Sequence, residues 1–157
     1  MSLPAVPHGS VMTTVAKKIL IVEDHPLFRA MLVQLIGQEP GMTVCGEADN
    51  VRDALRLIGE ERPDAAIVDL TLNGSSGLDL IEDLTARKVP FPVLVLSMHA
   101  EMLYAERAIH AGAKGYISKE EPPEEVVAAI RGVLEGRTYV SERVNRANLE
   151  RLGERDE

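Results

Sequence analysis

The sequence predicts an α/β domain in which a doubly wound, five-stranded parallel sheet with strand order 2-1-3-4-5 is covered by five helices. Short runs of β-branched and other apolar residues alternate along the chain with longer segments of helical periodicity, a pattern typical of repeated strand–helix units. The apolar runs are almost continuous, as in strands that are buried on both faces. Five such units, joined by right-handed crossovers, suit this strand order. The chain has 157 residues, 45% of them hydrophobic, which suits one domain with a substantial core.

The first part of the chain is expected to contain two strands with a helix between them. Residues 19–22 (ILIV) form a wholly apolar run, which predicts the first strand. Residues 25–39 carry apolar side chains at helical spacing, and Pro40-Gly41 is expected to end this helix. Residues 43–47 (TVCGE) are interpreted as the second strand.

The middle of the chain is expected to continue this alternation. Residues 51–61 are predicted to form the second helix, with Asn50 as its N-cap and Pro63 just after its end. Residues 64–69 (DAAIVD) contain the apolar run of the third strand. Residues 70–77 are rich in turn formers and are expected to be a loop.

The remaining elements follow from the same two periodicities. Apolar residues at helical spacing predict helices over residues 78–84, 102–109 and 126–134. Short apolar runs predict strands over residues 93–96 and 115–118. The predicted sheet therefore has five strands and five covering helices.

The composition excludes several classes of function. The net charge is −8 and the chain has three Tyr, two Phe and no Trp, so it lacks the basic and aromatic surface that nucleic acids require. The lone cysteine, Cys45, excludes a disulfide and a thiolate metal cluster, and it fits a reducing, cytoplasmic setting. No apolar run reaches the ~18–20 residues of a membrane span. Residues 1–16 lack the pattern of a signal peptide, so we expect a cytoplasmic protein without membrane contact.

Charged and hydroxyl side chains stand at the ends of four predicted strands. Glu23 and Asp24 follow the first strand, Asp69 ends the third, Ser97 follows the fourth and Lys119 follows the fifth. Sheets of this type bind ligands beyond the carboxyl ends of their strands, so these side chains are expected to lie together. Three neighbouring carboxylates repel one another unless a cation intervenes, and Mg²⁺ with oxygen ligands suits such a site. Asp69 would then be a nucleophile that forms an acyl phosphate, with Lys119 neutralising a phosphoryl oxygen.

The sequence resembles the receiver domain of two-component response regulators, and more narrowly the receivers of the NarL/FixJ type that precede a LuxR-type helix-turn-helix domain. Four ordered motifs carry the resemblance: residues 19–29 (ILIVEDHPLFR), 64–70 (DAAIVDL), 93–99 (VLVLSMH) and 111–119 (AGAKGYISK). The resemblance implies a flavodoxin-like fold and a function as a phosphorylation-activated signalling switch.

The resemblance also implies a role for each residue of the site. Glu23 and Asp24 would bind Mg²⁺ together with Asp69 and the backbone carbonyl of Thr71. Asp69 would accept the phosphoryl group from a sensor histidine kinase. Lys119 would contact the phosphoryl group.

Signal output is expected to begin at a pair of switch residues. By the resemblance, Ser97 would move toward the phosphoryl group, and the ring of Tyr116 would turn inward. The altered surface would comprise the fourth helix, fifth strand and fifth helix, where Met102, Tyr104 and Ile109 are expected to be available to a partner. We expect a homodimer on phosphorylation, and DNA contact only through an output domain that is not in this chain.

Two departures from the family pattern lie close to the site. Asn73 stands where the family usually has proline, although Asn-Gly is itself a good turn. Glu120 follows Lys119 and replaces the proline that a cis peptide at this point would use. Neither departure removes a reactive group.

The chain is expected to divide into three parts. Residues 1–16 are interpreted as a disordered leader or expression remnant, residues 17–138 as the receiver, and residues 139–157 as a linker or tail without an output domain. Residues 141–157 carry four Arg against five acidic residues, which is typical of a solvated helix or linker. Two forms of output stay open: the receiver part of a longer transcription regulator, or a stand-alone receiver that acts by protein contact.

Two other protein classes share part of this pattern. A haloacid-dehalogenase-type phosphatase needs a second Asp two residues after its nucleophile, where this chain has Thr71. A flavodoxin-like FMN carrier needs a phosphate-binding loop after the first strand, where Glu23 and Asp24 would repel phosphate. We therefore expect no enzyme activity beyond self-phosphorylation and self-dephosphorylation. The histidines are expected to be isolated surface residues rather than a transition-metal site: His8, His25, His99 and His110.

Overall fold

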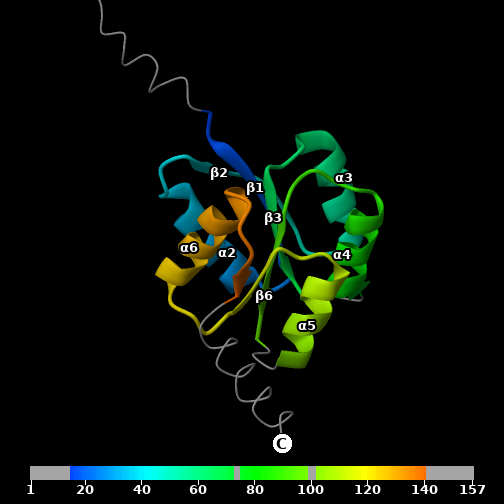
Figure 1. Ribbon diagram of the computed structural model, residues 1–157. Helices are drawn as coiled ribbons and strands as arrows, with labels where there is room; N and C mark the ends of the chain where they lie inside the picture. The colour runs from blue at the N-terminus through cyan, green and yellow to red at the C-terminus, as the bar shows by residue number, and fades with distance from the viewer. Residues whose placement is uncertain (1–14, 73–74, 99–101, 141–157) are drawn as a thin grey trace, which may run out of the picture.

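The computed structural model describes residues 15–72, 75–98 and 102–140, and Figure 1 shows how its elements are arranged. The strands of the main sheet are β1 (Lys17–Val22), β2 (Met42–Ala48), β3 (Ala65–Asp69), β6 (Val93–Ser97), β7 (Gly115–Ser118) and β8 (Tyr139–Val140). The helices are α2 (Pro26–Gly37), α3 (Val51–Glu61), α4 (Gly77–Ala86), α5 (Met102–Ala111) and α6 (Pro123–Leu134). Two short strands, β4 (Thr71–Leu72) and β5 (Ser75–Ser76), form a separate hairpin.

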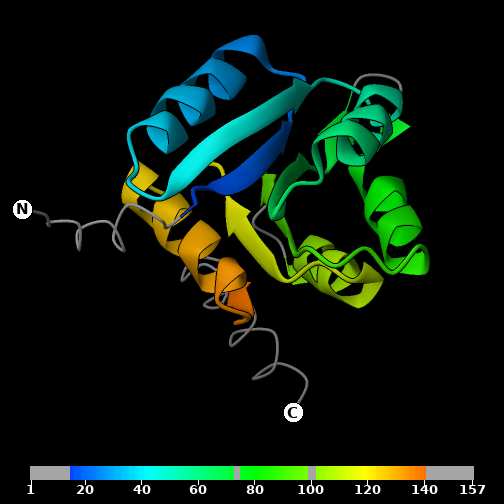
Figure 2. The ribbon, with the colours of Figure 1, turned by 90° about the horizontal axis from the view of Figure 1, so that it is seen from above.

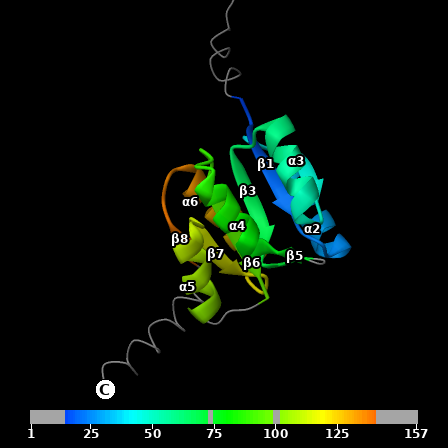
Figure 3. The same cartoon turned by 90° about the vertical axis from the view of Figure 1, so that its right-hand side faces the viewer.

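The main sheet has the order β2-β1-β3-β6-β7-β8, and all its strands are parallel. Its first five strands confirm the predicted 2-1-3-4-5 order. Helices α2 and α6 cover one face and α3, α4 and α5 cover the other, as Figure 2 shows. Figure 3 shows the arrowheads of β1 and β3 pointing toward the same end of the molecule. The carboxyl ends of the strands therefore meet at one rim.

Side chains along the central strands alternate between two apolar cores. Ile19 and Ile21 of β1 pack with α2 and α6, whereas Leu20 and Val22 pack with α3, α4 and α5. Tyr116 of β7 belongs to the second of these cores and is fully buried. Burial on both faces explains why the sequence shows continuous apolar runs rather than alternation.

Side-chain caps define where two of the helices begin. Asn50 caps α3 as predicted, since its side-chain oxygen accepts a hydrogen bond from the N–H of Asp53 at 2.8 Å. Helix α4 begins at Gly77 because the Ser76 hydroxyl accepts a hydrogen bond from the N–H of Leu78 at 3.1 Å. None of the helices described here combines the length and apolar character needed to span a bilayer.

The segment after β3 contains a hairpin where a loop was predicted. Thr71 pairs with Ser76 and Leu72 pairs with Ser75, both in antiparallel register. The expected Asn73-Gly74 turn lies between these pairs, outside the described residues. The prediction of a loop over residues 70–77 was therefore wrong for the four residues that pair in this hairpin.

A sixth strand extends the sheet beyond the predicted domain. Tyr139 and Val140, which were placed at the start of the tail, form β8 and pair with Gly115 and Tyr116. The N–H of Tyr139 donates to the carbonyl oxygen of Lys114 at 2.9 Å. This pairing lies beside the proposed switch residue. Residues 1–14 of the predicted leader and residues 141–157 of the predicted tail lie outside the described residues.

Candidate functional site

The residues predicted at the strand ends do converge on one rim. Glu23 and Asp24 follow β1, Asp69 is the last residue of β3, Ser97 is the last residue of β6, and Lys119 follows β7. The register of the sheet places β3 beside β6 and β6 beside β7 at this rim. Their proximity therefore follows from parallel pairing of strands whose apolar runs end at the same level.

Lys119 lies at the centre of the charged groups. Its ammonium nitrogen lies 2.9 Å from Oδ2 of Asp69 and 2.8 Å from Oε1 of Glu23, and its side chain is only 4% exposed. The same nitrogen lies 4.6 Å from the centre of the Phe28 ring, which adds a cation–π contact. The backbone N–H of Lys119 donates to the carbonyl oxygen of Ser97 at 2.8 Å, so adjacent strands fix this residue.

Asp69 forms part of the wall of a cavity of about 260 Å³ at this rim. Its Oδ2 faces Lys119, and its Oδ1 accepts a hydrogen bond from the N–H of Thr71 at 3.2 Å. A carboxylate that faces a cavity is accessible to an incoming electrophile, although most of the residue is buried. The cavity is lined by Asp24, His25, Asp69, Thr71, Met98 and Lys119.

Glu23 is buried beside this cavity and does not line it. Burial raises the pKa of Glu23, while the hydrogen bonds from Lys119 and from the backbone of His25 oppose this shift. Its Oε1 faces Lys119, and its Oε2 accepts the N–H of His25 at 3.0 Å. Both oxygens of Glu23 thus already have a partner, and its predicted role as a cation ligand stays a prediction.

Four neighbouring side chains could hold a metal ion at this rim. Glu23, Asp24, His25 and Asp69 each offer a ligand atom, and these atoms lie within 4.8 Å of one another. Carboxylate oxygens suit Mg²⁺, so the donor set fits the predicted cation. Thr71 lines the same cavity, as its predicted role as a backbone ligand requires.

The predicted switch residues are both buried in this structure. Ser97 is 1% exposed and Tyr116 is 0% exposed. Ser97 pairs with Ser118, and Tyr116 pairs with Val95, in the adjoining strands. The ring of Tyr116 thus occupies the inward position, and its movement on phosphorylation stays a prediction.

The apolar surface expected on the fourth helix needs correction. Tyr104 and Ile109 are only partly exposed, because both pack against the core on this face of the sheet. Leu103 is the more exposed residue, at 45%. The side chain of Met102 lies outside the described part of the structure. Helical periodicity identified the helix here but not which of its apolar residues face outward.

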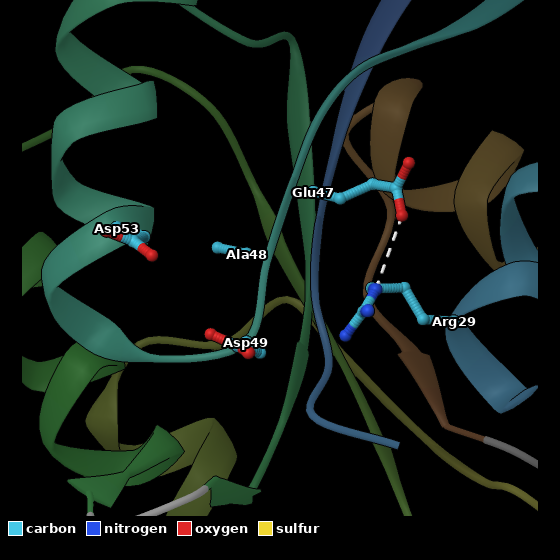
Figure 4. A pocket seen from close by; sticks show the side chains of 5 residues that line it. All are labelled: Arg29, Glu47, Ala48, Asp49 and Asp53. Carbon is cyan, nitrogen blue, oxygen red and sulfur yellow. Dashed lines mark ion pairs between the residues drawn. The ribbon is translucent and has the colours of Figure 1, made fainter. Parts of the chain in front are cut away.

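Arg29 was not singled out from the sequence, yet it supports the site from α2. Its guanidinium donates to the backbone carbonyl oxygen of Glu23 at 2.7 Å and lies 3.3 Å from the carboxylate of Glu47 on β2. Figure 4 shows the ion pair at the side of a second pocket, which is lined by Arg29, Glu47, Ala48, Asp49 and Asp53. Arg29 therefore joins the carboxyl ends of β1 and β2 to the first turns of α2.

His25 is the other residue that sequence reasoning missed. Its side chain is 71% exposed, as expected of a surface histidine, but Nδ1 lies 3.8 Å from Oε2 of Glu23 and the residue lines the cavity. Its position directly after Glu23 and Asp24 was the available signal. His110 lies in the last turn of α5, away from this cavity, and His8 and His99 lie outside the described residues.

Comparisons with known proteins identify the family of this domain. Residues 19–131 match the response regulator receiver domain. The response regulator GacA of Pseudomonas aeruginosa is 34% identical over 127 residues, which cover 81% of this chain and 59% of GacA. The DNA-binding transcriptional activator DevR/DosR of Mycobacterium tuberculosis is 33% identical over 135 residues, which cover 86% of this chain and 62% of that protein. This chain thus spans less than two thirds of the length of these relatives.

A solved structure gives the same result for the fold. The two-component response regulator of the LuxR family from Aurantimonas sp. matches with a TM-score of 0.82 and 34% identity, covering 87% of this chain and 99% of that one. The sheet order, the acidic rim with its central lysine and these matches lead to one conclusion. This chain belongs to the response regulator receiver domain family, and its relatives are regulators of the NarL/LuxR type.

Proposed function

We propose that the domain is a switch in which Asp69 accepts a phosphoryl group from the phosphohistidine of a sensor histidine kinase. The observation that carries the proposal is the Lys119 ammonium, 2.9 Å from the Asp69 carboxylate at the wall of an open cavity. A carboxylate oxygen of Asp69 would bond to phosphorus while the bond from phosphorus to the histidine nitrogen breaks. The product is an acyl phosphate on Asp69, and the kinase histidine keeps the electron pair of the broken bond.

The domain's own residues prepare Asp69 for this transfer. Lys119 is held by Glu23 and Phe28, so its charge is in place before a phosphoryl group arrives. We propose Glu23, Asp24, Asp69 and the carbonyl of Thr71 as the ligands of Mg²⁺, with Glu23 also positioning Lys119 beside them. Bound Mg²⁺ would supply positive charge that stabilises the phosphoryl oxygens.

No further enzymatic turnover is proposed for the domain. Its chemistry would be limited to accepting and losing one phosphoryl group. A phosphatase that uses an aspartyl nucleophile is a remote alternative, because it would need a general acid two residues after Asp69. Thr71 occupies that position and donates its backbone N–H to Asp69 instead.

The proposed output is control of transcription in the cytoplasm. DevR/DosR is named as a DNA-binding transcriptional activator, and this chain covers only part of that protein's length. We therefore propose that these residues form the receiver of a longer regulator whose DNA-binding part lies outside them. A stand-alone receiver that acts by protein contact is the alternative.

Dimerisation is proposed as the link between phosphate and output. The phosphoryl oxygens would attract the Ser97 hydroxyl and change the face formed by α5, β7 and α6. Strand β8 lies along β7 beside Tyr116, so a partner that approaches this face would also meet Tyr139 and Val140. A change in the position of Tyr116 would then alter the position of β8 and of the segment that follows it.

Intact-mass spectrometry tests the acceptor. The protein is incubated with acetyl phosphate or carbamoyl phosphate, with and without Mg²⁺. Wild type should gain one phosphoryl group only when Mg²⁺ is present, and Asp69→Asn should gain none. Asp79→Asn, which changes an exposed aspartate on α4, serves as the matched control and should react like wild type. Equal labelling of Asp69→Asn would refute the assignment.

Light scattering tests the output. Beryllofluoride, which mimics the phosphoryl group, should shift wild type from monomer toward dimer. Ser97→Ala and Tyr116→Phe should weaken this shift, although both variants should still gain a phosphoryl group on Asp69 in the mass-spectrometry test. If both variants dimerise as wild type does, the Ser97–Tyr116 coupling is wrong although the acceptor chemistry stands.

A further inference from the structure

Glu23, at the end of β1, is held at each of its polar groups. Its N–H donates to the carbonyl oxygen of the last residue of β2 at 2.8 Å. Its own carbonyl oxygen accepts a hydrogen bond from Nη1 of Arg29 at 2.7 Å. Its carboxylate contacts Lys119 at 2.8 Å and the N–H of His25 at 3.0 Å. Arg29 is therefore the side chain that fixes the carbonyl group of this buried residue.

The next residue, Asp24, has much less to hold it. Its side chain lines the cavity beside Asp69, and it makes no hydrogen bond or ion pair within residues 15–72, 75–98 and 102–140. The direction of this side chain therefore depends on the backbone. Because the peptide group is planar, a contact that fixes the Glu23 carbonyl also fixes the plane from which Asp24 extends.

Arg29 is itself anchored on two sides. Its Nε lies 3.3 Å from Oε1 of Glu47 on β2, as Figure 4 shows, and its side chain is only 23% exposed. Its backbone N–H donates to the carbonyl oxygen of His25 at 2.9 Å in the first turn of α2. A guanidinium is a rigid planar group, so the contact with Glu47 also fixes the nitrogen that reaches the Glu23 carbonyl.

We infer that Arg29 is a positioning residue that directs the Asp24 carboxylate toward the cation in the cavity. The inference rests on the proposed function for the site and its Mg²⁺, and it adds a residue that does not line the cavity. The charge of Arg29 acts in the opposite sense, because a guanidinium beside an acidic rim repels a cation. Loss of a positioning contact weakens Mg²⁺ binding, whereas loss of charge alone strengthens it.

Calorimetric titration of the unphosphorylated protein with Mg²⁺ tests the inference by this difference in sign. Arg29→Met, which keeps an unbranched apolar stem but has no donor, should bind Mg²⁺ about tenfold more weakly than wild type. Arg56→Met, which changes an exposed arginine on α3, is the matched control and should bind like wild type. Unchanged or tighter Mg²⁺ binding in Arg29→Met would overturn the inference.

A conservative variant separates positioning from charge. Arg29→Lys returns one donor nitrogen, so it should bind Mg²⁺ more tightly than Arg29→Met does. A pure charge effect predicts the reverse order, and that order would also overturn the inference.

A further variant keeps the test valid if Arg29→Met does not fold. Arg29→Gln, with a shorter polar side chain, should likewise bind Mg²⁺ more weakly than wild type, and affinity equal to wild type would overturn the inference. Failure of wild-type Asp69 to accept phosphate would instead refute the proposed function and leave the Mg²⁺ comparison intact.

Discussion

A Cβ atom on Gly77 would lie 2.0 Å from the backbone carbonyl oxygen of Asp69. The first residue of α4 therefore packs directly against the backbone of the proposed phosphoryl acceptor. The N–H of Gly77 also donates to the carbonyl oxygen of Leu70 at 2.9 Å, which closes the hairpin between them. The position of Asp69 thus depends on the absence of a side chain eight residues later in the sequence.

We expect Gly77→Ala to destabilise the fold by about 2 kcal/mol or more, because the obstructing atoms belong to backbone and cannot rotate away. Urea unfolding measures the change. Gly59→Ala is the control, since nothing lies within 4 Å of a Cβ at that exposed position in α3. It should stabilise by about 0.5–1 kcal/mol through helix propensity. Equal stability of Gly77→Ala and wild type would show that the contact is relieved elsewhere.

Lys119→Met should destabilise the protein by about 3 kcal/mol near neutral pH, because it leaves two buried carboxylates without their cation. Burial already raises the pKa of Glu23, and losing Lys119 should raise it further. The folded state would then bind a proton more tightly than the unfolded chain does. Protonation of Glu23 therefore stabilises the folded variant. This stabilisation is complete below the ordinary carboxyl pKa and is lost as pH rises through the raised pKa of Glu23.

The stability loss in Lys119→Met should therefore be smaller in mildly acidic buffer than at neutral pH. Urea unfolding at the two pH values checks the sign. Lys114→Met, which removes an exposed lysine just before β7, should show neither the loss nor its pH dependence. A loss of equal size at both pH values would mean that the carboxylates do not depend on Lys119 for their charge.

Asp24→Ala should reduce the rise in Tm that Mg²⁺ causes, because it removes a carboxylate from the cavity. Without Mg²⁺ the variant should be as stable as wild type or slightly more stable, since one source of repulsion at the rim is gone. Thermal melts with and without Mg²⁺ measure both effects. Glu82→Ala, at an exposed position on α4, should keep the full shift. A full Mg²⁺ shift in Asp24→Ala would place the cation elsewhere.

Tyr139 should titrate near pH 12 in the folded protein. Burial and the adjacent Glu125 carboxylate, which accepts the phenol's hydrogen bond, raise the pKa of Tyr139 to about 12. Ultraviolet absorbance of wild type minus that of Tyr139→Phe isolates this ionisation. Glu125→Gln should move the transition toward the ordinary value of 10.0.

The phenol's contribution to stability is present below its ordinary pKa and is lost as pH rises through about 12. Ionisation of Tyr139 at the ordinary value in the folded state would refute the contact with Glu125.

The sequence was most informative where local pattern and burial agree. Apolar runs predicted β7 with its observed bounds, and periodicity with the Asn50 cap predicted α3 with its observed bounds. Parallel order then brought Asp69 and Lys119 to one rim, although they lie 50 residues apart. Each of these predictions needed only short-range signals and the rule that strand ends share an edge.

Details of the site could not be predicted in the same way. Whether Glu23 or His25 faces the cavity depends on where Lys119 lies, and no spacing in the sequence encodes that contact. Strand β8 has two residues, too few to show an alternating pattern. Its pairing depends on a turn after α6 and on the small residues Gly115 and Gly132 beside it.

Strand β8 also affects where a stable fragment of this domain can end. It covers the backbone of β7 beside Tyr116, which would otherwise be an open strand edge able to recruit a neighbouring chain. A fragment that ends at Thr138, the boundary predicted from the sequence, would expose this edge and should aggregate more readily than one that ends after Val140. We therefore expect the smallest fragment that stays monomeric to include Tyr139 and Val140, which were predicted to belong to the tail but pair with the sheet.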